Sequence, residues 1–108
     1  MPDPLKPDDI DAVIHERARL SIVAALAVTP QLSFNELKAM LQLTDGNLSA
    51  HARALEEVGY VAVEKSFRGR KPYTSLSLTA KGRKAFDRYL KTLRQIINCG
   101  DQPREDTS

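Results

Sequence analysis

Residues 43–61, LTDGNLSAHARALEEVGYV, form the stretch of sequence that decides the fold. Thr44 is suited to cap a helix, and Asp45 follows in the first turn, where the helix dipole favours an acid. Apolar residues then recur at intervals of four, three and three, at Leu48, Ala52, Leu55 and Val58. Gly59 supplies a residue for a left-handed C-cap. The stretch therefore predicts an amphipathic helix with both ends marked.

A shorter helix is predicted just before this stretch. Ser33 followed by Glu36 forms a capping box, in which hydroxyl and carboxylate each accept a hydrogen bond from a backbone amide of the other residue. The apolar residues that follow share one helical face, and they are Phe34, Leu37, Met40 and Leu41. The segment runs to about Gln42. Two short helices with a tight connection, the second with a small polar outer face, are typical of a helix-turn-helix.

The N-terminal part of the chain predicts an arm followed by an apolar helix. Residues 1–9 hold three prolines and three aspartates, and we expect a flexible arm there. Residues 10–28 lack Gly and Pro, and a stripe of apolar side chains recurs every four residues, at Ile10, Ile14, Ala18, Ile22 and Leu26. Further apolar residues widen the stripe. Such a helix lies in a core or between subunits.

The pattern changes after Gly59 from helical to extended. Residues 60–67 and 73–79 read as two strands, separated by a basic turn at residues 68–72. Thr79 can cap a last helix at residues 80–98, and residues 100–108 are expected to be a disordered tail. The prediction is a single domain at residues 10–99, which is mainly α with a β-hairpin (α+β).

The order helix, helix, helix, hairpin, helix is the plan of a winged helix-turn-helix. Residues 43–61 and residues 67–86, FRGRKPYTSLSLTAKGRKAF, resemble small single-domain bacterial winged-helix transcriptional regulators related to the MarR and ArsR groups. The resemblance covers roughly residues 15–97 and rests on the joint pattern of DGNLS-x-H, L-E-x-x-G-Y, a basic G-R-x-P turn and L-T-x-x-G. It implies a homodimer that pairs the first and last helices.

Charge is distributed unevenly along the chain. The whole chain has a formal net charge of +2. Residues 1–59 hold five basic and nine acidic side chains, whereas residues 60–94 hold ten basic and two acidic side chains. A segregated basic block indicates a polyanionic partner, although a solvated basic face remains an equal alternative on charge alone.

The outer face of the third predicted helix is slim and polar, as entry into the major groove of DNA requires. Gly46 lets the backbone approach DNA, Asn47 and Ser49 are suited to base edges or phosphate, and Arg53 to guanine or phosphate. His51 is equally suited to a phosphate contact or to packing between helices. The predicted contact residues are Thr44, Asp45, Gly46, Asn47, Ser49, Ala50, His51 and Arg53.

The tip of the predicted hairpin places three cations within four residues. Guanidinium groups on a thin ribbon suit the narrow minor groove of A·T-rich DNA, whose negative potential is strongest. The alternative is an ordinary solvated basic turn, and Tyr73 is as well suited to packing on the sheet as to phosphate. The predicted contact residues of this wing are Arg68, Gly69, Arg70, Lys71, Tyr73 and Thr74.

The last predicted helix carries a heptad-like apolar seam, and the first helix also needs cover. A symmetric dimer buries both and predicts a pseudo-palindromic DNA site, whereas the alternative is a monomer whose last helix folds back on the core. The residues predicted to dimerise are Ile10, Val13, Ile14, Phe86, Tyr89, Leu90, Leu93, Ile96 and Ile97.

Signals for other functions are weak. The two histidines, His15 and His51, have no metal-ligand partners at suitable spacing, and the nucleophile and phosphate-loop motifs are absent. We therefore expect no enzyme activity, no cofactor and no metal, and we expect the thiol of Cys99 to be inert. We also expect a cytoplasmic protein, because no segment reads as a signal peptide or a membrane span. The sequence predicts a DNA-binding transcriptional regulator, with repression as the expected outcome. Two alternatives stay open: a protein-interaction module, and a regulator with a small-molecule site at the dimer interface.

Overall fold

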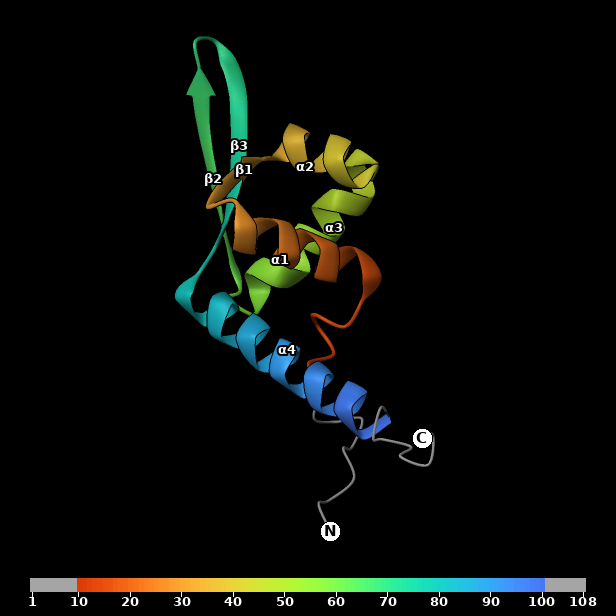
Figure 1. Cartoon of the computed structure of the whole chain (residues 1–108). Coiled ribbons are helices and arrows are strands. Elements are labelled where there is room, and N and C mark those ends of the chain that lie inside the picture. The colour runs from red at the N-terminus through yellow and green to blue at the C-terminus, as the bar shows by residue number, and fades with distance from the viewer. Residues whose placement is uncertain (1–9, 101–108) are drawn as a thin grey trace.

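The computed structural model of the chain describes residues 10–100, so the predicted arm at residues 1–9 and the tail from residue 101 onward lie outside the described residues (Figure 1). The elements follow one another as α1 (Arg17–Val28), β1 (Gln31–Ser33), α2 (Phe34–Leu41), α3 (Asp45–Glu57), β2 (Val61–Arg68), β3 (Lys71–Leu78) and α4 (Ala80–Gly100). This order confirms the predicted winged helix-turn-helix plan, mainly α with a β-hairpin.

The sheet has three antiparallel strands in the order β1-β3-β2. The sequence did not predict β1, whose Leu32 pairs with Leu76 of β3 and is buried. Strands β2 and β3 pair along their whole length, from Val61 opposite Leu78 to Arg68 opposite Lys71. Figure 1 shows that the outer half of this hairpin projects past the helices, whereas its base lies against them.

The hydrophobic core lies where α1, α2, α3 and the base of the hairpin meet. Side chains from each of these elements, and one from the turn before α1, are completely or almost completely buried: Ile14, Ile22, Val23, Leu26, Leu37, Leu48, Leu55 and Leu76. Burial of such side chains stabilises the fold by about 1.5–3 kcal/mol each relative to exposure. The core therefore fixes α3 and the base of the hairpin relative to each other.

The first helix is shorter than predicted, because it begins at Arg17 and not at residue 10. One carboxylate oxygen of Asp11 accepts hydrogen bonds from the backbone amides of Val13 and Ile14, which holds residues 11–14 in turns. Glu16 then caps the helix by accepting from the amide of Arg19 at 3.0 Å. The apolar stripe therefore predicted the helix correctly from Ala18 onward. Before Arg17, side-chain capping by Asp11 and Glu16 favours turns over a helix.

The ends of α2 and α3 are where the sequence places them. Ser33 and Glu36 make both hydrogen bonds of the capping box, at 2.8 and 2.9 Å. The hydroxyl of Thr44 accepts from the amide of Asn47 at 3.1 Å, and Gly59 has a φ of +81°, which only glycine adopts without strain. These local signals confirm the predicted start of both helices and the end of the second.

The start of α4 is fixed tightly to the start of β2. The hydroxyl of Thr79 donates to the carbonyl of Gly59 at 2.6 Å and accepts from the amide of Gly82 at 2.9 Å. A Cβ atom on Gly82 would collide with the carbonyl of Tyr60, so any larger residue would push α4 away. The L-T-x-x-G pattern therefore has a structural cause, since Thr79 caps the helix and Gly82 permits close packing.

Candidate nucleic-acid interface

Helix α3 has a buried face and an exposed face. Leu48 and Leu55 are completely buried and Ala52 is 7% exposed, so this side of the helix belongs to the core. The predicted contact residues, except His51, are exposed on the other side and at the N-terminal end of the helix: Thr44, Asp45, Gly46, Asn47, Ser49, Ala50 and Arg53. Gly46 has no neighbouring atom within 4 Å of the position of a Cβ. The first part of the exposed face therefore carries short side chains, and the longer Arg53, Glu56 and Glu57 follow toward the end of the helix.

Two of the predicted contact residues interact with other helices of the same chain. Asp45 forms an ion pair with Lys38 of α2, at 2.8 Å between carboxylate and ammonium. His51 is half-buried, and its Nδ1 atom lies 3.4 Å from the guanidinium of Arg19 and 3.8 Å from the carboxylate of Glu16. These distances favour the packing role of His51 between helices over a phosphate contact.

The carboxylate beside His51 is held in its charged form. The pKa of Glu16 is lowered chiefly because its side chain accepts a hydrogen bond from the backbone amide of Arg19, and the nearby His51 also lowers it. Partial burial opposes this shift. Glu16 therefore provides a negative charge at the start of α1, facing the middle of α3.

The hairpin tip is exposed and basic. Arg68, Gly69, Arg70 and Lys71 are all exposed, and none of the three cations forms an ion pair with another residue of the described part of the chain. The guanidinium of Arg68 lies over the ring of Tyr73, 4.1 Å from its centroid. Tyr73 is thus half-buried beneath Arg68, which supports the alternative that it packs on the sheet.

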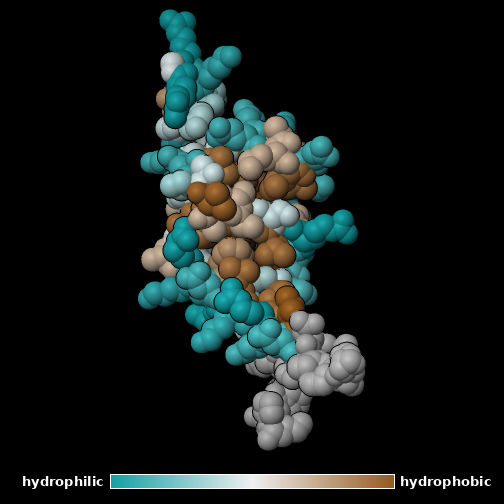
Figure 2. Space-filling view, viewed as in Figure 1, coloured by the Kyte–Doolittle hydropathy of each residue, from teal (hydrophilic) through white to brown (hydrophobic). Residues whose placement is uncertain are grey.

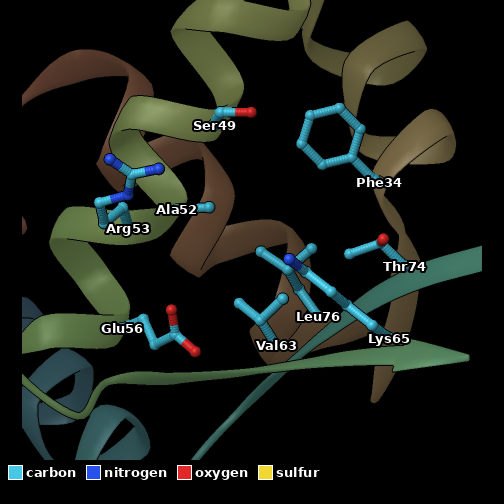
Figure 3. Close-up of a pocket in the computed structure, with 9 residues that line it drawn as sticks. All are labelled: Phe34, Ser49, Ala52, Arg53, Glu56, Val63, Lys65, Thr74 and Leu76. Atoms are coloured by element: carbon cyan, nitrogen blue, oxygen red, sulfur yellow. The ribbon is translucent and has the colours of Figure 1, made fainter.

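A hollow of about 340 Å³ separates α3 from the hairpin (Figure 3). Its apolar lining consists of Phe34, Ala52, Val63 and Leu76, and its polar lining consists of Ser49, Arg53, Glu56, Lys65 and Thr74. Figure 3 shows α3 on one side of the hollow and β2 and β3 on the other, with the ammonium of Lys65 pointing toward α3. Residues predicted separately on the helix (Ser49, Arg53) and on the wing (Thr74) therefore line one concavity.

Sequence reasoning missed Lys65 as a member of this site. Side chains alternate along a strand, so Lys65 shares a face of β2 with Val61 and Val63, which lie against the core. That alternation was available in the sequence and could have placed the lysine toward α3. Glu56 and Phe34 were also missed, because their positions depend on how α2 and α3 pack against the sheet.

The residues predicted to dimerise divide into three groups. Ile14, Phe86 and Tyr89 are at most 8% exposed and belong to the core of a single chain, so they offer little surface to a partner. Ile10, Val13 and Leu93 are half-buried against the core. Leu90, Ile96 and Ile97 are exposed, by 40%, 37% and 59%. The apolar seam of α4 is therefore covered by its own chain near its start and uncovered toward its end.

Tyr89 shows how the chain covers the first part of this seam. Its hydroxyl lies 2.8 Å from Nδ1 of His15, in the turn before α1, and burial raises the pKa of this tyrosine. Its ring also stacks on Phe86. The turn at residues 10–16 thus packs on α4 within one chain, as the monomer alternative expected for part of the helix.

Helix α1 leaves apolar surface uncovered. Val28 is 84% exposed, and Leu20, Ala24 and Ala27 are only half-buried. Figure 2 shows hydrophobic residues gathered over α1 and continuing toward α4, whereas the projecting hairpin is mostly hydrophilic. An apolar face and a polar, basic wing therefore occupy different parts of the molecule.

Residues 10–100 show neither a metal-binding cluster nor a helix able to span a membrane. Within that range, no group of three or more His, Cys, Asp and Glu side chains is placed to hold a metal ion. The helices described there are all too short or too polar to cross a bilayer. The side chain of Cys99 lies outside the description, so its expected inertness stays a prediction.

Known proteins are similar to this chain in sequence and in fold. A family model described as a winged helix DNA-binding domain matches residues 18–97. An uncharacterised protein of Methanocaldococcus jannaschii is 38% identical over 90 residues, which cover 81% of this chain and 98% of that protein. The structure of a transcriptional regulator homologue from Pyrococcus horikoshii OT3 matches with a TM-score of 0.78 and 31% identity, over 82% of this chain and 88% of that one.

The crystal structure of MarR matches with a TM-score of 0.70, over 87% of this chain and 69% of that one. At 21% identity, this match shows a shared fold. The family match covers both α3 and the hairpin, which frame the hollow described above. The chain therefore belongs to the winged helix DNA-binding domain family and has the fold of MarR-type transcriptional regulators.

Proposed function

We propose that this protein is a sequence-specific transcriptional regulator that binds a pseudo-palindromic DNA site as a homodimer, with repression as the expected outcome. The observation that carries the proposal is the hollow between α3 and the hairpin. Exposed residues of α3 and residues of the wing line it from its two sides. A duplex that meets one of these surfaces is within reach of the other. We expect no enzyme activity, and the cytoplasm is the expected compartment.

Helix α3 is proposed to read bases in the major groove. Its exposed face is slim enough to enter the groove, and Asn47 offers an amide that pairs with adenine. Ser49 adds a hydroxyl for a base or phosphate, and Gly46 leaves the backbone open to close approach. Because α3 is fixed by the core, these side chains are presented at a defined angle.

The hollow is proposed to receive part of the sugar-phosphate backbone between the two groove contacts. Arg53 and Lys65 supply cations from its two sides, and Ser49 and Thr74 supply hydroxyls. Glu56 also lines the hollow, and its charge disfavours a phosphate close to it. We therefore place the backbone near Lys65 and Thr74, farther from Glu56.

The wing is proposed to anchor the protein in the neighbouring minor groove. Arg70 lies in the turn itself, where nothing in the described chain competes for its guanidinium. Arginine inserted into a narrow minor groove is favoured by the strong negative potential there. Arg68 and Lys71, paired across the ribbon, are suited to the phosphates on either side.

Dimerisation is proposed through the uncovered parts of α1 and α4. Val28 on α1 and Leu90, Ile96 and Ile97 on α4 are exposed apolar side chains that a second copy would cover. A two-fold dimer presents two α3 helices to the duplex, spaced by one helical turn or a multiple of it. We expect Ile97→Asp to yield a monomer in sedimentation, while Arg70→Ala, on the wing, leaves the dimer intact.

The decisive experiment is selection of bound duplexes from a random pool, followed by gel shifts at physiological salt. The proposal expects enrichment of a two-fold symmetric site and retardation of that duplex. A protein-interaction module would enrich no sequence and retard no duplex, which would overturn the proposal. A small-molecule site at the dimer interface was an alternative left open by the sequence, and a thermal-shift screen of the dimer would test it separately.

A further inference from the structure

We propose that Phe67 is a wedge that enters the minor groove and partly unstacks one base step beside the cations of the wing. This inference rests on the proposed DNA-binding function and adds a specificity-determining residue to it. Phe67 is 71% exposed, whereas folded proteins gain free energy by burying a side chain of this size. The position of Phe67 beside the basic turn explains why its ring is exposed.

Phe67 lies in β2 immediately before the basic turn. It is opposite Pro72 in the register of the hairpin, and Arg68 is the next residue along the strand. By strand alternation, Phe67 shares a face with Lys65, which lines the hollow toward α3. The aromatic ring therefore continues the inner face of the wing outward, beyond the site proposed for the phosphate backbone.

The described part of the chain leaves most of this ring uncovered. Phe67 belongs neither to the hydrophobic core nor to the side chains packed against it. The outer half of the hairpin extends beyond the helices (Figure 1). On its own face of the hairpin its neighbours are Lys65 along β2 and Pro72 directly opposite, and both are exposed. A protein-binding surface is a larger apolar patch than one ring, whereas a groove of DNA admits a single wedge.

The charges near the ring suit a nucleic acid. Arg68, Arg70 and Lys71 are exposed within four residues of Phe67, with Arg68 and Lys71 paired on the opposite face of the ribbon, and all three are suited to the phosphates that border a minor groove. Arg68 is held over the ring of Tyr73, 4.1 Å from its centroid, which limits its freedom. An exposed apolar ring close to cations is the composition of the apolar wedges that kink duplexes by unstacking a base step.

This role predicts a preference at a position that no hydrogen bond reads. Pyrimidine–purine steps such as TA and CA unstack most easily, so they should be favoured where Phe67 enters. The preferred step should lie in the minor groove that flanks the bases contacted by α3. Sites that carry a stiff step there should bind more weakly even when every base facing α3 is unchanged.

The test uses the full-length protein and duplexes enriched by the selection described above. 2-Aminopurine is placed at successive positions of the flanking minor groove, and its fluorescence rises where a base is unstacked. The wild type should raise the signal at one step of each half-site, and Phe67→Ala should abolish this rise and weaken binding about tenfold. Phe67→Leu keeps an apolar wedge and should retain most of the signal.

Matched controls separate a wedge from a general loss. Met40→Ala removes another exposed apolar side chain, on α2, and should change neither the signal nor the affinity. Because Phe67 is mostly exposed, Phe67→Ala should keep the melting temperature of the wild type, which establishes that the variant folds. A wild-type complex without any fluorescence rise would overturn the wedge. So would a rise that survives in Phe67→Ala. Failure of the wild type to bind any enriched duplex would overturn the proposed function itself.

Discussion

Helix α3 and the outer half of the β2–β3 hairpin are both proposed to contact DNA, yet the protein holds them in opposite ways. Leu48 and Leu55 fix α3 from below and are completely buried, while its outer face carries short polar side chains. The hairpin is fixed only at its base, and its tip is a basic ribbon exposed on all sides (Figure 1).

The difference suggests a division of labour. A helix fixed by the core presents Asn47 and Ser49 at a set angle, as discrimination between bases requires. A projecting hairpin holds its side chains at a less defined angle. Its cations are nevertheless attracted to phosphates, whatever the DNA sequence. Changes beneath α3 should therefore alter stability, changes on its surface should alter sequence preference, and changes to the cations of the wing tip should alter overall affinity.

The largest expected effect is a loss of stability when a buried side chain of α3 is shortened. Leu48→Ala should lower the free energy of unfolding by about 2–5 kcal/mol, because Leu48 is completely buried and the core cannot fully close the cavity. Denaturant unfolding measures this loss. Arg70 is exposed, so the free energy of unfolding of Arg70→Ala should stay within about 0.5 kcal/mol of the wild type. An equal loss of stability in both variants would contradict the proposed difference between α3 and the wing.

Asn47→Ala should change which sequences are preferred. Losing one amide contact to a base edge removes about 1–3 kcal/mol of discrimination at a single base position, so the enriched site should become degenerate there. Gel shifts against duplexes that vary only at that position provide the measurement. Uniform weakening on specific and random duplexes alike would assign Asn47 to phosphate instead.

Arg70→Ala should weaken binding to all duplexes by a similar factor. With about four phosphate contacts in each subunit, the slope of log K against log salt should be near −7 for the wild-type dimer. A guanidinium held in the minor groove between two phosphate rows displaces counterions as a phosphate contact does, so each lost Arg70 should reduce the steepness by about 1. Titrations on an enriched duplex and a random duplex should show the same reduction, whereas a reduction on the enriched duplex alone would make Arg70 a reader of sequence.

The smallest expected effect concerns Tyr60, which anchors the base of the hairpin. Burial raises the pKa of Tyr60 to about 12, and the hydrogen bond that its hydroxyl donates to Asp11 at 2.6 Å adds to the shift. Because the folded state disfavours the phenolate, this stabilisation is complete below pH 10 and is lost as the pH rises toward 12.

Replacing Tyr60 with Phe should flatten this alkaline loss. Unfolding of the wild type and of Tyr60→Phe, followed across the same pH interval, isolates the contribution of this tyrosine from that of the lysines. Equal slopes for the two proteins would show that Tyr60 ionises as freely in the folded chain as in the unfolded one.

The sequence predicted the features whose causes are local. Ser33, Thr44 and Gly59 mark helix ends through hydrogen bonds or backbone angles within a few residues, and the structure confirms all three. The alternation of residues 73–79 was likewise sufficient to predict β3, which starts two residues earlier and ends one residue earlier than predicted. In this chain such local signals agree with the overall fold, so they could be read without it.

The features that the sequence did not reveal depend on partners far along the chain. Strand β1 is three residues long and exists because it pairs with β3, where Gln31 also donates to the hydroxyl of Ser75. The turn before α1 is held by Asp11, whose partner Tyr60 is 49 residues away. The apolar stripe of residues 10–28 could not show this competition between helix and turn.

The candidate site was predicted as two separate patches. Exposure of α3 and of the wing tip follows from amphipathic pattern and turn chemistry, both readable in the sequence. The hollow between them depends on the packing of α2 and α3 against the sheet, so Lys65, Phe34 and Glu56 entered the site only with the structure.

The central claim is that α3 and the wing contact one duplex at the same time, in adjacent grooves. An iron chelate attached to a single cysteine, at Asn47→Cys in one protein and Arg70→Cys in another, both with Cys99→Ser, would cut DNA where each residue lies. The account predicts cleavage from residue 47 within each half-site and cleavage from residue 70 about five base pairs away, half a helical turn farther out. Cleavage from only one of the two positions, or from both at the same bases, would contradict it.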